Sequence, residues 1–146
     1  MTPSMKSASK IRAIAERRVL LDTHVFLRAL SAPEKLSTQA LDIISDPKSE
    51  VFISSAVVWE IVIKYSLGKL ELPSDPTTYL PARITQLGFR YLPITHEHAL
   101  TVTVLPKHHR DPFDRMLVAQ ARFEGMTLIS SDPSVRRYGV QYLMVG

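Results

Sequence analysis

The sequence predicts an α/β fold, a three-layer α/β/α sandwich with a mainly parallel central sheet. Short runs of consecutive apolar residues, such as 19–21 and 51–53, alternate with longer segments of helical periodicity. Continuous apolar runs are typical of parallel strands that are covered on both faces. Strands separated by helices favour parallel pairing, because a parallel connection needs a crossover that a helix usually supplies.

In the first half of the chain, strand and helix signals alternate as this fold requires. The strand over 19–21 precedes a short helix, and Ser37 is a typical N-cap for the helix that comes next. A second strand is expected over 51–53, followed by a helix over 56–67. Gly68 is expected to end that helix, because glycine adopts the positive φ of a C-terminal cap without strain.

In the second half, prolines punctuate a loop between residues 72 and 81, and Asp75 followed by Pro76 is a helix-start signature for a helix towards Gly88. The remaining expected elements are a strand at 91–92, a helix from Thr95 to about Thr103, a helix from Asp111 to near Gly125, a strand at 127–129, a helical turn at 133–138 and an edge strand at 141–145.

Length and composition favour one domain of an intracellular protein. The 146 residues, 45% of them hydrophobic, suffice for a core without staples. Residues 1–18 are expected to be an N-terminal extension, flexible or the result of a mis-set start codon, and 19–146 the domain itself. The chain has no cysteine, which excludes disulfides and thiolate zinc sites and favours a reducing cytoplasm. Because no apolar run approaches about 20 residues, we expect no membrane association.

The net charge is positive, with 18 Lys and Arg against 14 Asp and Glu, or +4. A basic surface around an acidic, metal-filled pocket is the arrangement expected of an enzyme that acts on nucleic acid, because phosphates are attracted broadly and hydrolysed locally. Charge alone is equally compatible with a role in solubility.

Four carboxylates are the strongest functional signal. Asp22 and Asp132 each follow a short apolar run, and Glu60 and Asp114 lie inside helical patterns. In a parallel α/β sheet, ligands bind beyond the carboxyl ends of the strands, where we expect these acids to meet. Acids that converge raise one another's pKa unless a cation neutralises them, and hard oxygen ligands favour Mg²⁺ or Mn²⁺.

Each acid also has a purely structural interpretation. Asp22 and Asp132 can each cap the helical turn that follows, and Asp114 stands where a capping-box acid stands. Glu60 has Lys64 at i+4, and it shares a stripe with otherwise apolar positions of its helix (Ala56, Ile63 and Leu67), so its carboxylate needs a partner. Lys64 can supply that partner or orient Glu60 beside a metal, and the sequence does not separate the two roles.

The order and spacing of these motifs resemble those of the PIN-domain ribonucleases, and most closely the VapC-type toxins of type II toxin–antitoxin systems. The resemblance extends over residues 19–145. The segments that carry it are LLDTH at 20–24, SAVVWEI at 55–61, LGKL at 67–70, HRDPFDRM at 109–116 and SSD at 130–132.

The resemblance implies a metal-dependent endoribonuclease that is a homodimer, is silenced by a cognate antitoxin and, as a toxin, inhibits translation or growth. The four family acids fall on the residues named above, with Ser130 as the hydroxyl that supports the last acid. We expect Asp22 and Asp114 to bind the metal directly. Glu60 and Asp132 are expected to act through water or a second metal, with Thr23 and Lys64 in supporting roles.

Other residues carry weaker signals. Lys107, His108, His109 and Arg110 form a basic run that can grip an RNA backbone or remain solvated, and Arg115 can contact a phosphate or face solvent. Two histidine pairs raise a zinc interpretation but lack the spacing of an HExxH helix: His96 with His98, and His108 with His109. Trp59 can stack on a base or pack in a core or subunit interface.

Rival functions make distinguishable demands on the sequence. A phosphoacceptor receiver domain needs adjacent acids after the first strand, whereas Asp22 is flanked by Leu21 and Thr23. A haloacid-type phosphatase needs an acid two positions after the first one, where this chain has His24. Two alternatives within the PIN fold remain: a nuclease of RNA maturation or DNA processing, and a scaffold that binds RNA or protein without cutting.

Overall fold

The computed structural model describes residues 18–106, 111–138 and 142–144, and its centre is a five-stranded sheet in the order β3-β2-β1-β4-β5. All neighbouring strands are parallel. The strands are β1 (Arg18–Leu21), β2 (Glu50–Ser54), β3 (Arg90–Leu92), β4 (Thr127–Ser130) and β5 (Tyr142–Met144). The helices are α2 (Thr23–Ser31), α3 (Thr38–Ser45), α4 (Ser55–Ser66), α5 (Pro76–Gln86), α6 (His96–Thr101) and α7 (Pro112–Glu124), with 3₁₀ turns at Pro33–Lys35, Val102–Val104 and Pro133–Tyr138.

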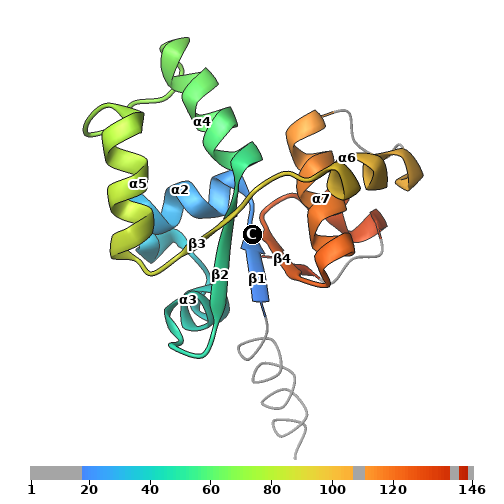
Figure 1. Ribbon diagram of the computed structural model, residues 1–146. Coiled ribbons are helices and arrows are strands. Elements are labelled where there is room, and N and C mark those ends of the chain that lie inside the picture. Colours follow the sequence, from blue (N-terminus) through green and yellow to red (C-terminus); the bar gives the residue numbers. More distant parts are fainter. Residues whose placement is uncertain (1–17, 107–110, 139–141, 145–146) are drawn as a thin grey trace, which may run out of the picture.

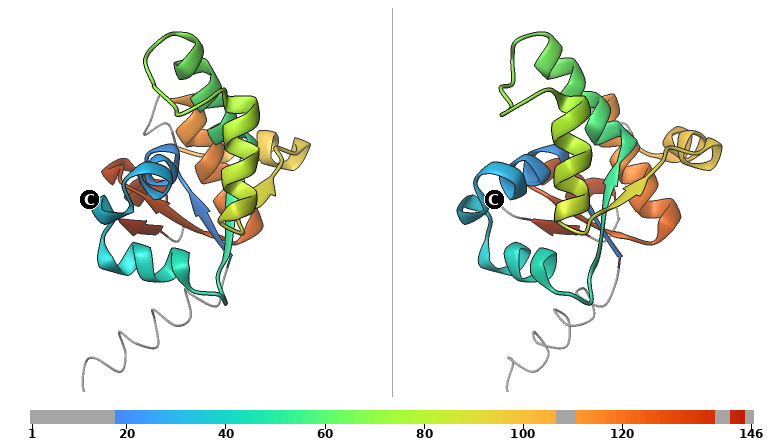
Figure 2. Two further views of the ribbon diagram at one scale, coloured as in Figure 1. Left: turned by 90° about the vertical axis from the view of Figure 1, so that its left-hand side faces the viewer. Right: turned by 60° about the vertical axis from the view of Figure 1, so that its left-hand side comes forward.

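Helices cover both faces of the sheet, which confirms the predicted three layers. Figure 1 shows α2, α3 and α5 on one side of the strands and α6 and α7 on the other. In the left view of Figure 2, α2, α3 and α5 lie in front of the sheet and α7 lies behind it. The middle strand is therefore fully buried over its last three residues: Val19, Leu20 and Leu21 of β1 have no exposed surface.

The strand order creates a switch point beside β1. Leu20 pairs with Phe52 of β2 on one side and with Leu128 of β4 on the other. The chain therefore builds outward from β1 through β2 to β3, and later returns to the opposite side of β1 to add β4 and β5. The carboxyl ends of β1 and β4 flank this switch point, which is where open α/β sheets bind ligands.

Local signals placed the helix ends well. Ser37, Asp75, Thr95 and Asp111 are all N-caps whose side chains accept backbone N–H bonds, and Ser54 caps α4. Gly68 and Gly125 follow α4 and α7 with φ of 73° and 68°, the left-handed conformation that glycine tolerates.

Two expectations need correction, and two lie outside the described residues. Pro81 does not belong to a loop but lies inside α5, on its exposed side, where water can satisfy the carbonyl that proline leaves without a donor. The helix from Thr95 ends at Thr101 and tightens into a 3₁₀ turn. The predicted extension over 1–18 is described only at Arg18, which begins β1, and the basic run 107–110 is not described.

Within the described residues, no helix has both the length and the apolar character needed to cross a membrane.

Candidate active site

Asp22 lies at the carboxyl end of β1, at the switch point, and is 6% exposed. Its Oδ1 accepts the Val25 N–H at 2.8 Å, so it caps α2 as predicted. Its Oδ2 accepts the Ser130 hydroxyl at 2.7 Å and the Ser131 N–H at 3.2 Å. Because β1 and β4 are neighbours, two residues more than one hundred positions away in the chain hold this carboxylate in place.

The electrostatic state of Asp22 is unusual for an aspartate. Burial raises its pKa, and this effect outweighs the opposing hydrogen bonds from Ser130, Val25 and Ser131. Buried carboxylates of this kind are stabilised in their charged form by a nearby cation. Asp22 is therefore a carboxylate whose surroundings favour a positive charge beside it.

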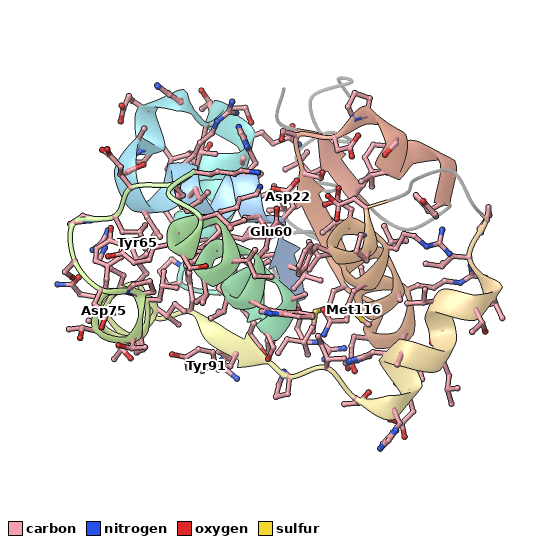
Figure 3. All side chains as sticks on the ribbon, turned by 90° about the horizontal axis from the view of Figure 1, so that it is seen from above. Asp22, Glu60, Tyr65, Asp75, Tyr91 and Met116 are labelled. Carbon is pink, nitrogen blue, oxygen red and sulfur yellow. The ribbon has the colours of Figure 1, made fainter. Side chains whose placement is uncertain are left out.

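Glu60 approaches Asp22 from α4 and is also buried, at 8% exposure. Its Oε1 accepts the hydroxyl of Thr23, the residue after Asp22, at 2.7 Å, and its Oε2 lies 2.7 Å from Lys64 Nζ. Figure 3, which looks down on the carboxyl edge of the sheet, shows Asp22 and Glu60 close together in the middle of the molecule. The sequence left open whether Lys64 only partners Glu60 or orients it beside a metal, and the structure shows the ion pair that both roles require.

The apolar stripe predicted around Glu60 is only partly right. The buried residues of α4 are Ala56, Val57, Glu60 and Ile61, whereas Leu67 is 62% exposed. Figure 1 shows why: α4 rises away from the carboxyl end of β2, so that its end projects beyond the sheet. Glu60 lies in the middle of this helix and belongs to its buried part, which ends before the exposed last turn.

Asp132 is joined to Asp22 through Ser130. Its N–H donates to the Ser130 hydroxyl at 3.0 Å, and that hydroxyl in turn donates to Asp22. The Asp132 Oδ1 accepts the Ser134 N–H at 2.9 Å, which confirms the capping interpretation of this acid. A structural role and a position beside Asp22 are therefore combined in one residue.

Asp114 lies in the first turn of α7, as the sequence indicated. The N-cap Asp111 accepts the N–H groups of Phe113 at 2.8 Å and Asp114 at 3.4 Å through its Oδ1. Both acids are near enough to Lys64 that their charges, after the larger effects of Glu60, help to raise the lysine pKa. The carboxylates of Asp111 and Asp114 at the start of α7 thus act on the same ammonium group as Glu60 on α4.

Asp22 is connected to Asp132 through Ser130, and to Glu60 through the neighbouring Thr23. The charge of Asp114 acts on Lys64 beside them, but these acids do not form a compact group. Across the ranges 18–106, 111–138 and 142–144, no three His, Asp or Glu side chains are close enough to hold one metal ion together. Hydroxyl, amide and ammonium donors contact Asp22, Glu60 and Asp132 instead. The predicted direct metal ligands, Asp22 and Asp114, remain a prediction.

Three of the weaker candidates make contacts within the protein. The Arg115 guanidinium donates to the carbonyls of Pro106 at 2.9 Å and Val102 at 3.1 Å, so it fastens the 3₁₀ turn to α7. Trp59 is 59% exposed and packs edge to face on Phe113, with ring centroids 5.3 Å apart. His98 is fully buried: its Nδ1 accepts the Thr95 N–H at 3.0 Å and its Nε2 lies 2.8 Å from a Glu124 oxygen.

Sequence reasoning missed two contributors to the site. The Ser131 backbone N–H has no residue-type signal because any residue can supply it. Asp111 was recognised only as a helix cap, and its proximity to Lys64 depends on how α4 packs against α7.

A parallel α/β/α sandwich with buried acids at its switch point defines the class of the protein. Residues 19–141 match the family model of the PIN domain, and the chain belongs to that family.

Relatives agree with this assignment. Ribonuclease VapC16 of Mycobacterium tuberculosis is 38% identical over 56 residues, which are 38% of this chain and 40% of that protein, so the match spans less than half of the relative. The solved structure of VapBC2 from Rickettsia felis bound to a promoter DNA fragment contains a chain that is 14% identical with a TM-score of 0.68, covering 88% of this chain and 99% of that one. The solved structure of FitAcB from Neisseria gonorrhoeae contains a chain that is 22% identical with a TM-score of 0.60, covering 86% of this chain and 96% of that one. At these identities the two structures establish the fold.

Proposed function

We propose that this protein is a metal-dependent endoribonuclease that hydrolyses RNA phosphodiester bonds, and that it is the toxin of a toxin–antitoxin pair that inhibits translation or growth. The observation that carries the proposal is the buried Asp22, fixed at the switch point of a PIN domain beside Glu60. The partial match to a relative named a ribonuclease supports RNA as the substrate.

The residues at this site suit Mg²⁺ or Mn²⁺ in their chemistry. Carboxylate oxygens are the ligands that these hard cations prefer, and Asp22 is buried in surroundings that raise its pKa. Asp22 and Asp114 would hold the ion directly, and Glu60 and Asp132 would contribute through water or at a second ion. When bound, the ion supplies positive charge that polarises the phosphodiester and makes a nearby water more acidic.

The chain's own residues would prepare the reaction. Ser130 and Ser131 fix one oxygen of Asp22, and Val25 fixes the other, so the carboxylate cannot rotate freely. The Thr23 hydroxyl holds one oxygen of Glu60 in the same way, and Lys64 pairs with the other oxygen in the metal-free protein. Such preorganisation is effective because the groups need not reorient as charge develops. A water oxygen would form the new bond to phosphorus and the bond to the 3′ oxygen would break, which leaves a 3′ hydroxyl and a 5′ phosphate.

The partners follow from the same assignment. The relatives include chains solved as VapBC2 and as FitAcB, the first on promoter DNA. By analogy we propose a cognate antitoxin that silences this protein, a homodimeric assembly and action in the cytoplasm. The net charge of +4 supports attraction of an RNA backbone.

The experiment is RNA cleavage by the purified protein with Mg²⁺ or Mn²⁺, comparing the natural sequence with Asp22→Asn. Asp42→Asn, on the exposed surface of α3, is the matched control. We expect the Asp22 variant to lose cleavage while it stays folded, and the control to retain it. Full cleavage by a folded Asp22→Asn variant would reject the assignment.

Sequencing of RNA 5′ ends after induction separates the remaining functions. Growth arrest with cleavage at a few sites supports a toxin, whereas trimmed precursors without arrest indicate RNA maturation. RNA binding without any new 5′ ends indicates a scaffold that does not cut.

A further inference from the structure

Lys64 places a positive charge inside the acidic site. It lies one helical turn after Glu60 on α4, and its Nζ is 2.7 Å from the Glu60 Oε2. The pair differs from an ordinary surface pair at this spacing because its two side chains are unequally exposed, 48% for Lys64 and 11% for Glu60. The lysine therefore neutralises a carboxylate that has little access to water.

The charge of Lys64 also reaches the second acid-bearing helix. The hydrogen bond to Glu60 is the main cause of its raised pKa, and the charges of Glu60, Asp111 and Asp114 add to it. One ammonium group thus serves acids of α4 and of α7, the helices from which a divalent ion would also draw ligands.

We propose that Lys64 is a positioning residue that holds Glu60 in the metal-free protein and competes with the divalent cation for the Glu60 carboxylate, thereby lowering the metal affinity of the site. This inference rests on the proposed function. Thr23 already donates to Oε1, so Oε2 is the oxygen that an arriving cation would seek, and Lys64 contacts it.

A cation held by Glu60 as a second ion would place its positive charge beside the ammonium group on the same carboxylate, and the repulsion between them would displace the ammonium group. The displacement is inexpensive because the lysine side chain is half exposed and its four-carbon stem is flexible. Lys64 then acts as a reversible counter-ion: it keeps Glu60 in position without the metal and yields that position when the metal binds.

The test is a Mn²⁺ titration of the whole purified protein, without RNA. Free Mn²⁺ is measured by electron paramagnetic resonance. The fluorescence of Trp59, the single tryptophan and the residue next to Glu60, provides a second signal. Lys64→Met removes the charge but keeps much of the stem, Lys64→Arg keeps the charge, and Lys48→Met, in the exposed turn before β2, is the control.

We expect Lys64→Met to lower the Kd for Mn²⁺ by about tenfold, because one unit charge is removed from beside the ion. Lys64→Arg should bind Mn²⁺ no more tightly than the natural protein, and Lys48→Met should not differ from it. Because Lys64→Met leaves a buried carboxylate without its partner, its metal-free Tm should fall and Mn²⁺ should raise its Tm more than that of the natural protein.

An unchanged or increased Kd in Lys64→Met overturns the competition. If that variant does not fold, tighter Mn²⁺ binding by Lys64→Arg overturns it as well, and weaker or equal binding supports it. Asp22→Asn distinguishes this failure from that of the proposed function. If the natural protein binds no Mn²⁺, or binds it equally well after Asp22→Asn, the metal assignment itself fails and the inference with it.

Discussion

Ser130 connects two of the candidate site acids, and its replacement by alanine gives the sharpest test of the site architecture. Its buried hydroxyl donates to the Asp22 Oδ2 at 2.7 Å and accepts the Asp132 N–H at 3.0 Å. Ser130→Ala removes both hydrogen bonds and adds no bulk. The Asp22 oxygen keeps the Ser131 N–H, whereas the bond from the Asp132 N–H to this hydroxyl is lost.

The expected cost follows from the two bonds. A hydrogen bond to a charged group contributes about 1.5–3 kcal/mol, and a bond between neutral groups about 1 kcal/mol. Ser130→Ala should therefore lower the free energy of unfolding of the metal-free protein by about 2.5–4 kcal/mol. Since the Ser130 hydrogen bond lowers the Asp22 pKa, its removal should raise that pKa further and weaken metal binding and RNA cleavage.

The assay is urea denaturation at neutral pH, followed by circular dichroism, with RNA cleavage measured on the same samples. Ser31→Ala is the control, because the Ser31 hydroxyl also makes one hydrogen bond, to the Leu27 carbonyl at 2.9 Å, but on the exposed surface of α2. The control should change the free energy of unfolding by less than about 0.5 kcal/mol. Equal stability of Ser130→Ala and Ser31→Ala, with equal cleavage, would refute the connected arrangement of Asp22, Ser130 and Asp132.

Three further predictions concern the charges and the supporting structure. Burial raises the folded-state pKa of Asp22, so ionising this carboxyl costs more free energy in the folded protein than in the unfolded chain. The metal-free protein should therefore lose stability relative to Asp22→Asn as the pH rises from about 3.9 through the raised pKa. Parallel plots of unfolding free energy against pH for the two proteins would contradict this prediction. Arg115→Met should lower the free energy of unfolding by about 1–2 kcal/mol through loss of two carbonyl contacts and leave the affinity for Mn²⁺ unchanged in a titration. His98→Ala should destabilise the protein by about 2–4 kcal/mol in urea denaturation, since it removes a fully buried ring together with its bonds to Thr95 and Glu124, and a variant of unchanged stability would show that these contacts are unimportant.

Much of the fold could be predicted because its signals are local. Caps such as Ser37 and Asp111 act within a few residues of their own position. The buried strand β1 is recognisable in the sequence because a strand covered on both faces needs an unbroken apolar run. Where the prediction was wrong, as at Pro81 and Leu67, the outcome depended on solvent exposure, which neighbouring elements determine.

The sequence predicts the candidate site as a set of residues but not as a set of contacts. The positions of Asp22, Glu60, Asp114 and Asp132 follow from their places at strand ends and on helices. The sequence did not show that Ser130 donates to Asp22, because that contact requires β4 to lie beside β1. Nor could it separate the two roles of Lys64, and it did not suggest the carbonyl contacts of Arg115.

The sequence by itself determined the order of strands and helices, the ends of most helices and the choice of candidate acids, since each depends on residue type and short-range spacing. Only the tertiary structure decided the strand order, the burial of Asp22 and Glu60, and the donors that hold them. These properties arise from packing between segments far apart in the chain. Their free energy depends on the whole tertiary arrangement, so no local sequence pattern predicts them.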